Sequence, residues 1–138
     1  MSKRLVGGAS AILAIVLAAL TLGATSEAEA YKQKELARYT RTGKLETCIP
    51  LGSIESTKIL DDKNILFLTD GGGAYLNELP DRCGPMDRYK AITYDTSLFK
   101  LCNTDVVNVM DFNSSVPKLG TCGLGQFEKL TPVKRSAK

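Results

Sequence analysis

The segment ILFLTDGGGAYLNE, residues 65–78, carries the clearest structural signal in this chain of 138 residues. Its first five residues are almost all apolar, which predicts a short strand buried on both faces and therefore central in a sheet. The run DGGG at 70–73 can adopt the positive φ values that a tight reversal requires. Residues 74–78 are then expected to return along the first strand, so the segment predicts an antiparallel hairpin.

Further short segments with strand character lie on both sides of this hairpin. They are SIESTKIL at 53–60, AITYD at 91–95, DVVNVMDF at 105–112 and an edge strand at 126–130. The residues between them, such as DDKN at 61–64, favour turns because Asp and Asn bond to their own backbone. Five or six short strands predict a mainly β fold, either a small antiparallel sheet or an open barrel. Closing a barrel would remove the exposed sheet edges, and the sequence leaves both forms open.

The first thirty residues differ from the rest and resemble an export signal. Lys3 and Arg4 precede an apolar run that ends near Leu22, and small residues follow as far as Ala30. This order predicts a secretory signal peptide over 1–30, cleaved after Ala30, with cuts after Ser26 or Ala28 as alternatives. The other interpretation is a retained membrane anchor, since the apolar run approaches the roughly 20 residues that span a bilayer. Cysteine is absent from this segment, so no lipid anchor is expected.

The remainder divides into three parts by composition. Residues 31–45 are polar and rich in helix formers, which predicts a short N-terminal helix or a disordered arm. Residues 46–131 are expected to form a single β domain, and 132–138 a disordered tail. The net charge of +3 is small and shows no clustered basic face, so we expect no nucleic-acid partner.

Four cysteines, Cys48, Cys83, Cys102 and Cys122, follow the signal segment. An even number in a small exported domain predicts disulfides. Zinc ligands usually come in close pairs, whereas these cysteines are 35, 19 and 20 positions apart and the chain has no histidine. A catalytic thiol usually needs a base, most often histidine. We therefore expect two disulfides, no metal and no cofactor.

Three pairings of the four cysteines are possible, and the sequence does not choose among them. We favour Cys83–Cys102 together with Cys48–Cys122. The first pair flanks one short strand-like segment, and the second lies near opposite ends of the expected domain.

Candidate binding residues gather on the expected middle strands and beside Cys83: Tyr75, Asn77, Arg82, Arg88 and Tyr94. Tyrosine and arginine are common in recognition surfaces. The simpler interpretation is that the tyrosines cover the core and the arginines solvate a loop. General acid catalysis requires a carboxyl group whose pKa is shifted by burial or by a neighbour, and no spacing marks such a group. The sequence predicts no catalytic residue.

The order of motifs from Cys48 onward resembles a family of exported bacterial proteins, domain of unknown function 6491. The resemblance covers about 46–130 and rests on Cys48-Ile49, Ile59-Leu60-Asp61-Asp62, Ile65-Leu66-Phe67, Tyr75-Leu76-Asn77-Glu78-Leu79-Pro80, Arg82-Cys83, Leu101-Cys102, Asp105 with Val107 and Val109, and Cys122-Gly123-Leu124-Gly125 with Phe127. It implies a periplasmic protein and supplies no activity. Some relatives look like lipoproteins, and this chain departs from them because no cysteine follows its signal segment.

We therefore predict an exported periplasmic protein that is not an enzyme and that serves as a binding or structural module of the cell envelope. Its partner would be an envelope protein or ligand that the sequence does not name, and membrane attachment is expected only if the signal segment is retained. One alternative is a hydrolase that uses carboxylates. Another is a secreted inhibitor that presents the Cys83 loop, LPDRCGPMDRY at 79–89.

Overall fold

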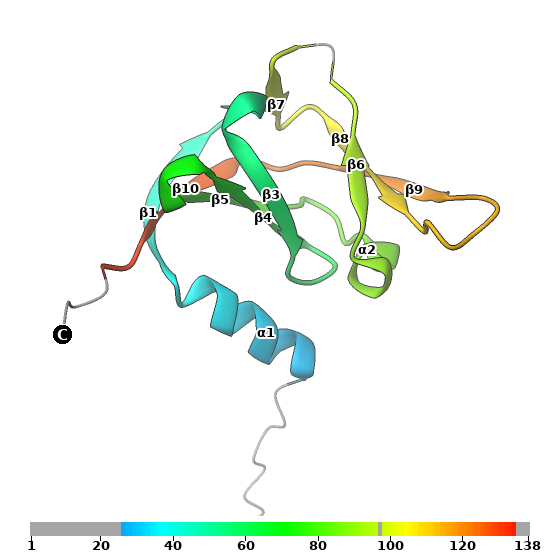
Figure 1. Ribbon diagram of the computed structural model, residues 1–138, viewed down its shortest axis with the longest axis horizontal. Coiled ribbons are helices and arrows are strands. Elements are labelled where there is room, and N and C mark those ends of the chain that lie inside the picture. Colours follow the sequence, from blue (N-terminus) through cyan, green and yellow to red (C-terminus); the bar gives the residue numbers. More distant parts are fainter. Residues whose placement is uncertain (1–25, 97, 135–138) are drawn as a thin grey trace, which may run out of the picture.

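The computed structural model describes residues 26–96 and 98–134 (Figure 1). Most of the predicted signal segment and the last four residues of the predicted tail lie outside these ranges. The prediction of a mainly β fold with an N-terminal helix and two disulfides is confirmed. The helix, α1, spans Glu27–Leu36, and no helix in the described ranges is long and apolar enough to cross a membrane.

The largest sheet is antiparallel and contains the predicted hairpin. Its strands lie in the order β1 (Tyr39–Glu46), β10 (Phe127–Pro132), β5 (Ala74–Glu78), β4 (Asn64–Thr69) and β3 (Ile54–Ile59). In the hairpin, Phe67 lies opposite Tyr75. Gly71 and Gly72 lie in the short 3-10 turn η2 (Asp70–Gly72) with φ values of 78° and 81°, so the connection uses the backbone freedom that was predicted for it.

Two smaller sheets complete the fold. One pairs β2 (Cys48–Pro50) with β7 (Lys100–Cys102), and the other has the order β6 (Ile92–Tyr94), β8 (Val106–Met110) and β9 (Lys118–Gly123). A short 3-10 turn, η1 (Leu51–Ser53), follows β2, and helix α2 (Gly84–Tyr89) precedes β6. Within the described residues the sheets do not close into a barrel. Six of the ten strands in the described residues coincide with predicted segments, and the four that were not predicted are β1, β2, β7 and β9.

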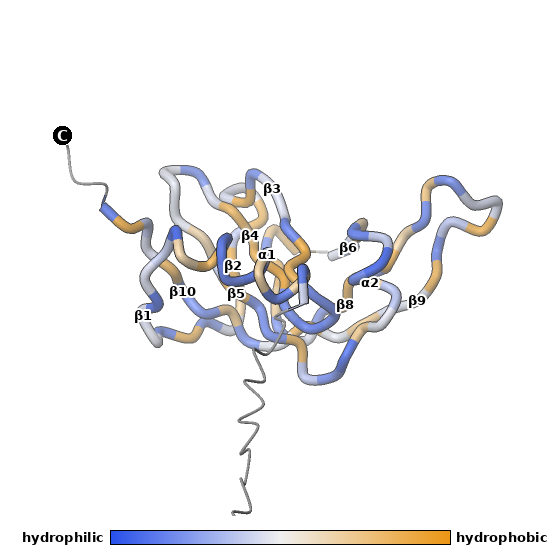
Figure 2. The backbone as a smooth tube through the Cα atoms, turned by 90° about the horizontal axis from the view of Figure 1, so that it is seen from below, coloured by the Kyte–Doolittle hydropathy of each residue, from blue (hydrophilic) through white to orange (hydrophobic). Residues whose placement is uncertain are grey.

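The central position of β4 explains its apolar sequence. Ile65, Leu66 and Phe67 are all fully buried, but Leu66 belongs to a different core cluster from its two neighbours. The main cluster contains Phe67 and Phe127, whose rings meet edge to face with centroids 5.6 Å apart. The second cluster lies on the opposite face of the sheet, next to α1. Figure 2 shows hydrophobic stretches around β4, and others along the β8–β9 hairpin.

The disulfides pair differently from our preference, which was wrong. Cys48 bonds to Cys102, directly opposite it in the register of β2 and β7. Cys83 bonds to Cys122 and thereby joins the start of α2 to β9. The prediction relied on positions along the sequence, whereas the pairing of β2 with β7 places Cys48 beside Cys102 and leaves Cys83 and Cys122 to bond to each other. The sequence separations of 54 and 39 residues imply that each crosslink alone stabilises the fold by about 4 kcal/mol in the chain-entropy model.

The N-terminal region is also more ordered than the predicted arm at 31–45. Helix α1 begins before the predicted cleavage site, and β1 occupies the second half of the arm as an edge strand on β10. Because β1 is polar and mostly exposed, backbone pairing and side-chain bonds hold it rather than burial. Arg41 bonds to Glu128 with an N–O distance of 2.6 Å, and the Thr42 hydroxyl donates to the Lys129 carbonyl. At the other end, β10 extends to Pro132, the first residue of the predicted tail.

Candidate ligand pocket

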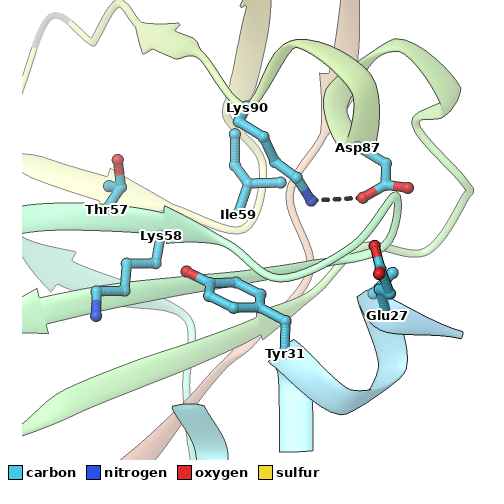
Figure 3. Close-up of a pocket in the computed structure, with 8 residues that line it drawn as sticks. Glu27, Tyr31, Thr57, Lys58, Ile59, Asp87 and Lys90 are labelled. Atoms are coloured by element: carbon cyan, nitrogen blue, oxygen red, sulfur yellow. Dashed lines mark hydrogen bonds and ion pairs between the residues drawn. The ribbon is translucent and has the colours of Figure 1, made fainter. Parts of the chain in front are cut away.

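A pocket of about 520 Å³ lies between α1, β3 and α2 (Figure 3). Its lining residues come from all three elements: Glu27, Ala28, Tyr31, Thr57, Lys58, Ile59, Asp87 and Lys90. The Tyr31 ring extends from α1 toward β3, and Glu27 and Asp87 point toward each other from the two helices. The pocket therefore depends on how the two helices are held against the sheet.

Contacts with the main core cluster and a disulfide hold helix α2 in place. Met86 is fully buried in the main core cluster, and the disulfide of Cys83 fixes the residue that precedes the helix. Lys90 ends the helix in the left-handed conformation, with φ of 53°, and its backbone N–H donates to the Met86 carbonyl. These anchors leave Asp87 and Lys90 on the solvent side, where they form an ion pair at the pocket wall.

Helix α1 is polar on most of its surface, and ion pairs hold it to the sheet. Glu35 is 6% exposed, and its carboxylate accepts a 2.7 Å hydrogen bond from Lys58 of β3. Lys32 lies 3.0 Å from the Asp61 carboxylate, and Leu36 packs against the second core cluster. Together these three contacts place Tyr31 over β3.

The ionisation of these carboxylates follows from their partners. The hydrogen bond from Lys58 lowers the pKa of Glu35 and outweighs the opposing effect of burial. At Asp61, burial alone would raise the pKa, but hydrogen bonds from Lys63, Asn64 and Lys32 together lower it. The hydrogen bond to Asp61 raises the pKa of Lys32. Both carboxylates are therefore ionised at neutral pH, as befits ion-pair partners rather than general acids.

The pocket combines apolar surface with paired charges. Ala28, Tyr31 and Ile59 provide apolar contact, while Lys58 and Lys90 each have an acidic partner. Glu27 has no ion-pair partner among residues 26–96 and 98–134. An apolar surface with a few polar groups is typical of small-molecule sites. No group of three acidic or sulfur side chains in the described ranges could hold a metal ion.

The predicted binding residues do not form one surface. Asn77 is fully buried and bonds twice to Gly125: its amide donates to the carbonyl at 2.6 Å, and its oxygen accepts from the N–H at 2.8 Å. Tyr75 and Tyr94 are half-buried against the main core cluster. The Tyr75 hydroxyl also donates to Glu46 at 3.4 Å, and burial followed by that carboxylate raises the pKa of Tyr75.

The two predicted arginines are exposed, and neither lines the pocket. Arg82 forms an ion pair with Asp62 at 2.8 Å. The guanidinium of Arg88 lies over the Tyr89 ring, 5.7 Å from its centroid. The Cys83 segment does not protrude as a free loop, since Cys83 and Met86 are buried. The β8–β9 hairpin instead extends away from the body (Figures 1 and 2).

Sequence reasoning missed Tyr31, Lys58 and Lys90 as lining residues. Tyr31 looked like one polar-helix residue among others, and Lys58 like a solvated lysine on a strand. Their shared role arises only because α1 docks across β3. The buried Glu35 offered no local signal, since an acidic residue in a polar helix is usually exposed.

No family model matches the chain, and neither the curated proteins nor the solved structures include a match. The resemblance to domain of unknown function 6491 therefore stays a prediction.

Proposed function

We propose that this protein is an exported, non-catalytic binding module of the bacterial periplasm, and that it takes a small amphipathic molecule in the pocket between α1, β3 and α2. The observation that carries the proposal is the pocket itself, with apolar contact from Tyr31 and Ile59 beside paired charges. Its volume falls within the range of roughly 300–1,000 Å³ that small-molecule sites occupy.

The disulfides support the proposed location outside the cytoplasm. Two disulfides, with no free cysteine among the described residues, indicate an oxidising environment outside the cytoplasm. The export signal predicted over 1–30 and the family resemblance favour the periplasm within that class of compartments.

Binding fits the pocket carboxylates better than the hydrolase alternative does. A carboxylate-dependent hydrolase needs one carboxyl group held protonated by burial or by a like charge. In this pocket Asp87 is paired with Lys90, and Glu27 lies upstream of the predicted cleavage after Ala30. A carboxylate held in an ion pair with a lysine suits electrostatic contact with a ligand.

A neutral fluorescent probe tests the proposal. N-phenyl-1-naphthylamine gains fluorescence in apolar sites, and we expect the protein purified from the periplasm to bind it at one site. Tyr31→Ala should weaken this binding about tenfold, the effect of removing a central aromatic contact. Tyr89→Ala is the matched control, since Tyr31 is 40% exposed and Tyr89 36% exposed, and only Tyr31 lines the pocket.

The control should change the affinity by less than about twofold, because it removes little contact area from the site. Thermal unfolding of both variants, followed by circular dichroism, verifies that each is folded. Equal losses in the two tyrosine variants, or no loss in Tyr31→Ala, would contradict the assignment of the pocket.

A further inference from the structure

We infer that signal-peptide cleavage after Ala30 changes the charge of this pocket and makes the processed protein selective for amphipathic anions. The inference rests on the proposed export and the proposed pocket, and it adds the chemical class of the ligand. Its basis is a juxtaposition that the sequence did not reveal: the predicted cleavage site lies within α1, and residues on both sides of it line the pocket.

Cleavage removes one acidic wall of the pocket. Glu27 and Ala28 lie upstream of the cut, and Tyr31 becomes the first residue. Signal peptidase hydrolyses the Ala30–Tyr31 bond with one water molecule. The carboxylate stays on Ala30 in the departing segment, and the amine stays on Tyr31. That α-amino group takes up a proton at neutral pH, since its ordinary pKa is about 7.7–8.0.

The charge of the pocket becomes more positive in two ways. The exposed carboxylate of Glu27 is lost, and an ammonium group appears at Tyr31, whose side chain lies across the pocket. The remaining charges balance, because Lys58 pairs with Glu35 and Lys90 pairs with Asp87. Before cleavage the carboxylate of Glu27 is in excess, and after cleavage the ammonium of Tyr31 is in excess.

The pocket survives this loss because the main anchors of α1 lie downstream of the cut. Lys32 bonds to Asp61, Glu35 accepts from Lys58, and Leu36 packs on the second core cluster. Cleavage removes the first four residues of α1 with their backbone hydrogen bonds, the Ser26 cap on the Glu29 N–H and the pair between Glu29 and Lys32. A partly exposed pair of this kind contributes at most about 1 kcal/mol.

Two probes of the same shape test the inference on the protein purified from the periplasm, with its N-terminus determined by intact mass. Anilinonaphthalene sulfonate carries one negative charge, and N-phenyl-1-naphthylamine has the same aromatic body without it. Acetylation of the α-amino group alone is feasible near pH 6.5, because lysines remain protonated there. Peptide mapping verifies that Tyr31 is the modified residue.

We expect acetylation to weaken binding of the anionic probe about threefold to tenfold, the effect of one nearby charge in a partly solvated site. Binding of the neutral probe should change by less than about twofold. Lys90→Asn should also selectively weaken the anion, and Asn tolerates the left-handed backbone at this position. Lys118→Gln, on the distant strand β9, is the matched control and should have no effect.

The outcomes separate the two proposals. If both probes bind and acetylation leaves their ratio unchanged, the further inference is wrong while the pocket assignment stands. An N-terminus other than Tyr31 also overturns it. If neither probe binds the processed protein, the proposed function itself fails.

Discussion

Replacing Asn77 with alanine should destabilise the fold more than any other single loss of a polar side chain among the predicted binding residues. Asn77 is fully buried, and its amide makes both hydrogen bonds to the backbone of Gly125. Alanine would leave a donor and an acceptor of Gly125 without these partners. Each such loss costs about 1–3 kcal/mol, so the free energy of unfolding should fall by about 2–6 kcal/mol.

Asn108→Ala provides the matched control for this prediction. Asn108 is also a largely buried strand residue, but its oxygen accepts only one long bond, at 3.3 Å from the Thr121 hydroxyl. Its loss should cost about 1 kcal/mol. Guanidinium denaturation with the disulfides intact, followed by circular dichroism, measures both values. The reasoning is refuted if Asn77→Ala loses no more stability than Asn108→Ala.

Gly125, the hydrogen-bond partner of Asn77, supplies a second test of the contact between these two residues. A Cβ atom on Gly125 would lie 2.1 Å from the carbonyl oxygen of Glu78, far inside contact distance, whereas one on Gly123 would meet no atom within 4 Å. Gly125→Ala should therefore cost at least as much as Asn77→Ala, because the backbone must move. Gly123→Ala should be nearly neutral in the same denaturation experiment.

Three further predictions concern the ion pairs of α1 and the crosslinks. Lys58→Met should lower stability by about 1–3 kcal/mol by leaving buried Glu35 without its donor, whereas Lys44→Met, at an exposed pair, should cost less than about 0.5 kcal/mol. Because the pKa of Glu35 is lowered in the folded protein, its contribution to stability is full above about pH 4.5 and disappears as pH falls through the lowered folded value. Stability measured against pH should therefore fall less steeply in acid for Glu35→Gln, and an unchanged slope would contradict this. Non-reducing peptide mapping should recover Cys48 linked to Cys102 and Cys83 linked to Cys122, and a Cys83–Cys102 peptide would contradict the fold.

The sequence predicted those parts of the fold that depend on short runs of neighbouring residues. The apolar run at 65–69 and the glycines after it predicted a buried strand and a tight turn, and both are present. Strand β1 was missed because its polar residues carry no burial pattern, and its place in the sheet comes from backbone pairing with β10. The cysteine pairing was mistaken for a similar reason, since it depends on the three-residue strands β2 and β7.

The pocket depends still more on long-range contacts. A polar helix gives no hydrophobic stripe from which its docked face could be predicted. The face that docks is selected by Lys32, Glu35 and Leu36, whose partners lie on and beside β3 and in the second core cluster. Side chains such as Tyr31 become candidates for binding only once that face is known.

The pocket between α1, β3 and α2 is the centre of the proposed function, and backbone amide chemical shifts test it most directly. The processed protein, labelled with ¹⁵N, is titrated with N-phenyl-1-naphthylamine. We predict that the largest shifts fall at Thr57, Ile59 and Lys90, which line the pocket. Largest shifts on the β8–β9 hairpin, at Phe112 and Val116, or no localised shifts at all, would contradict it.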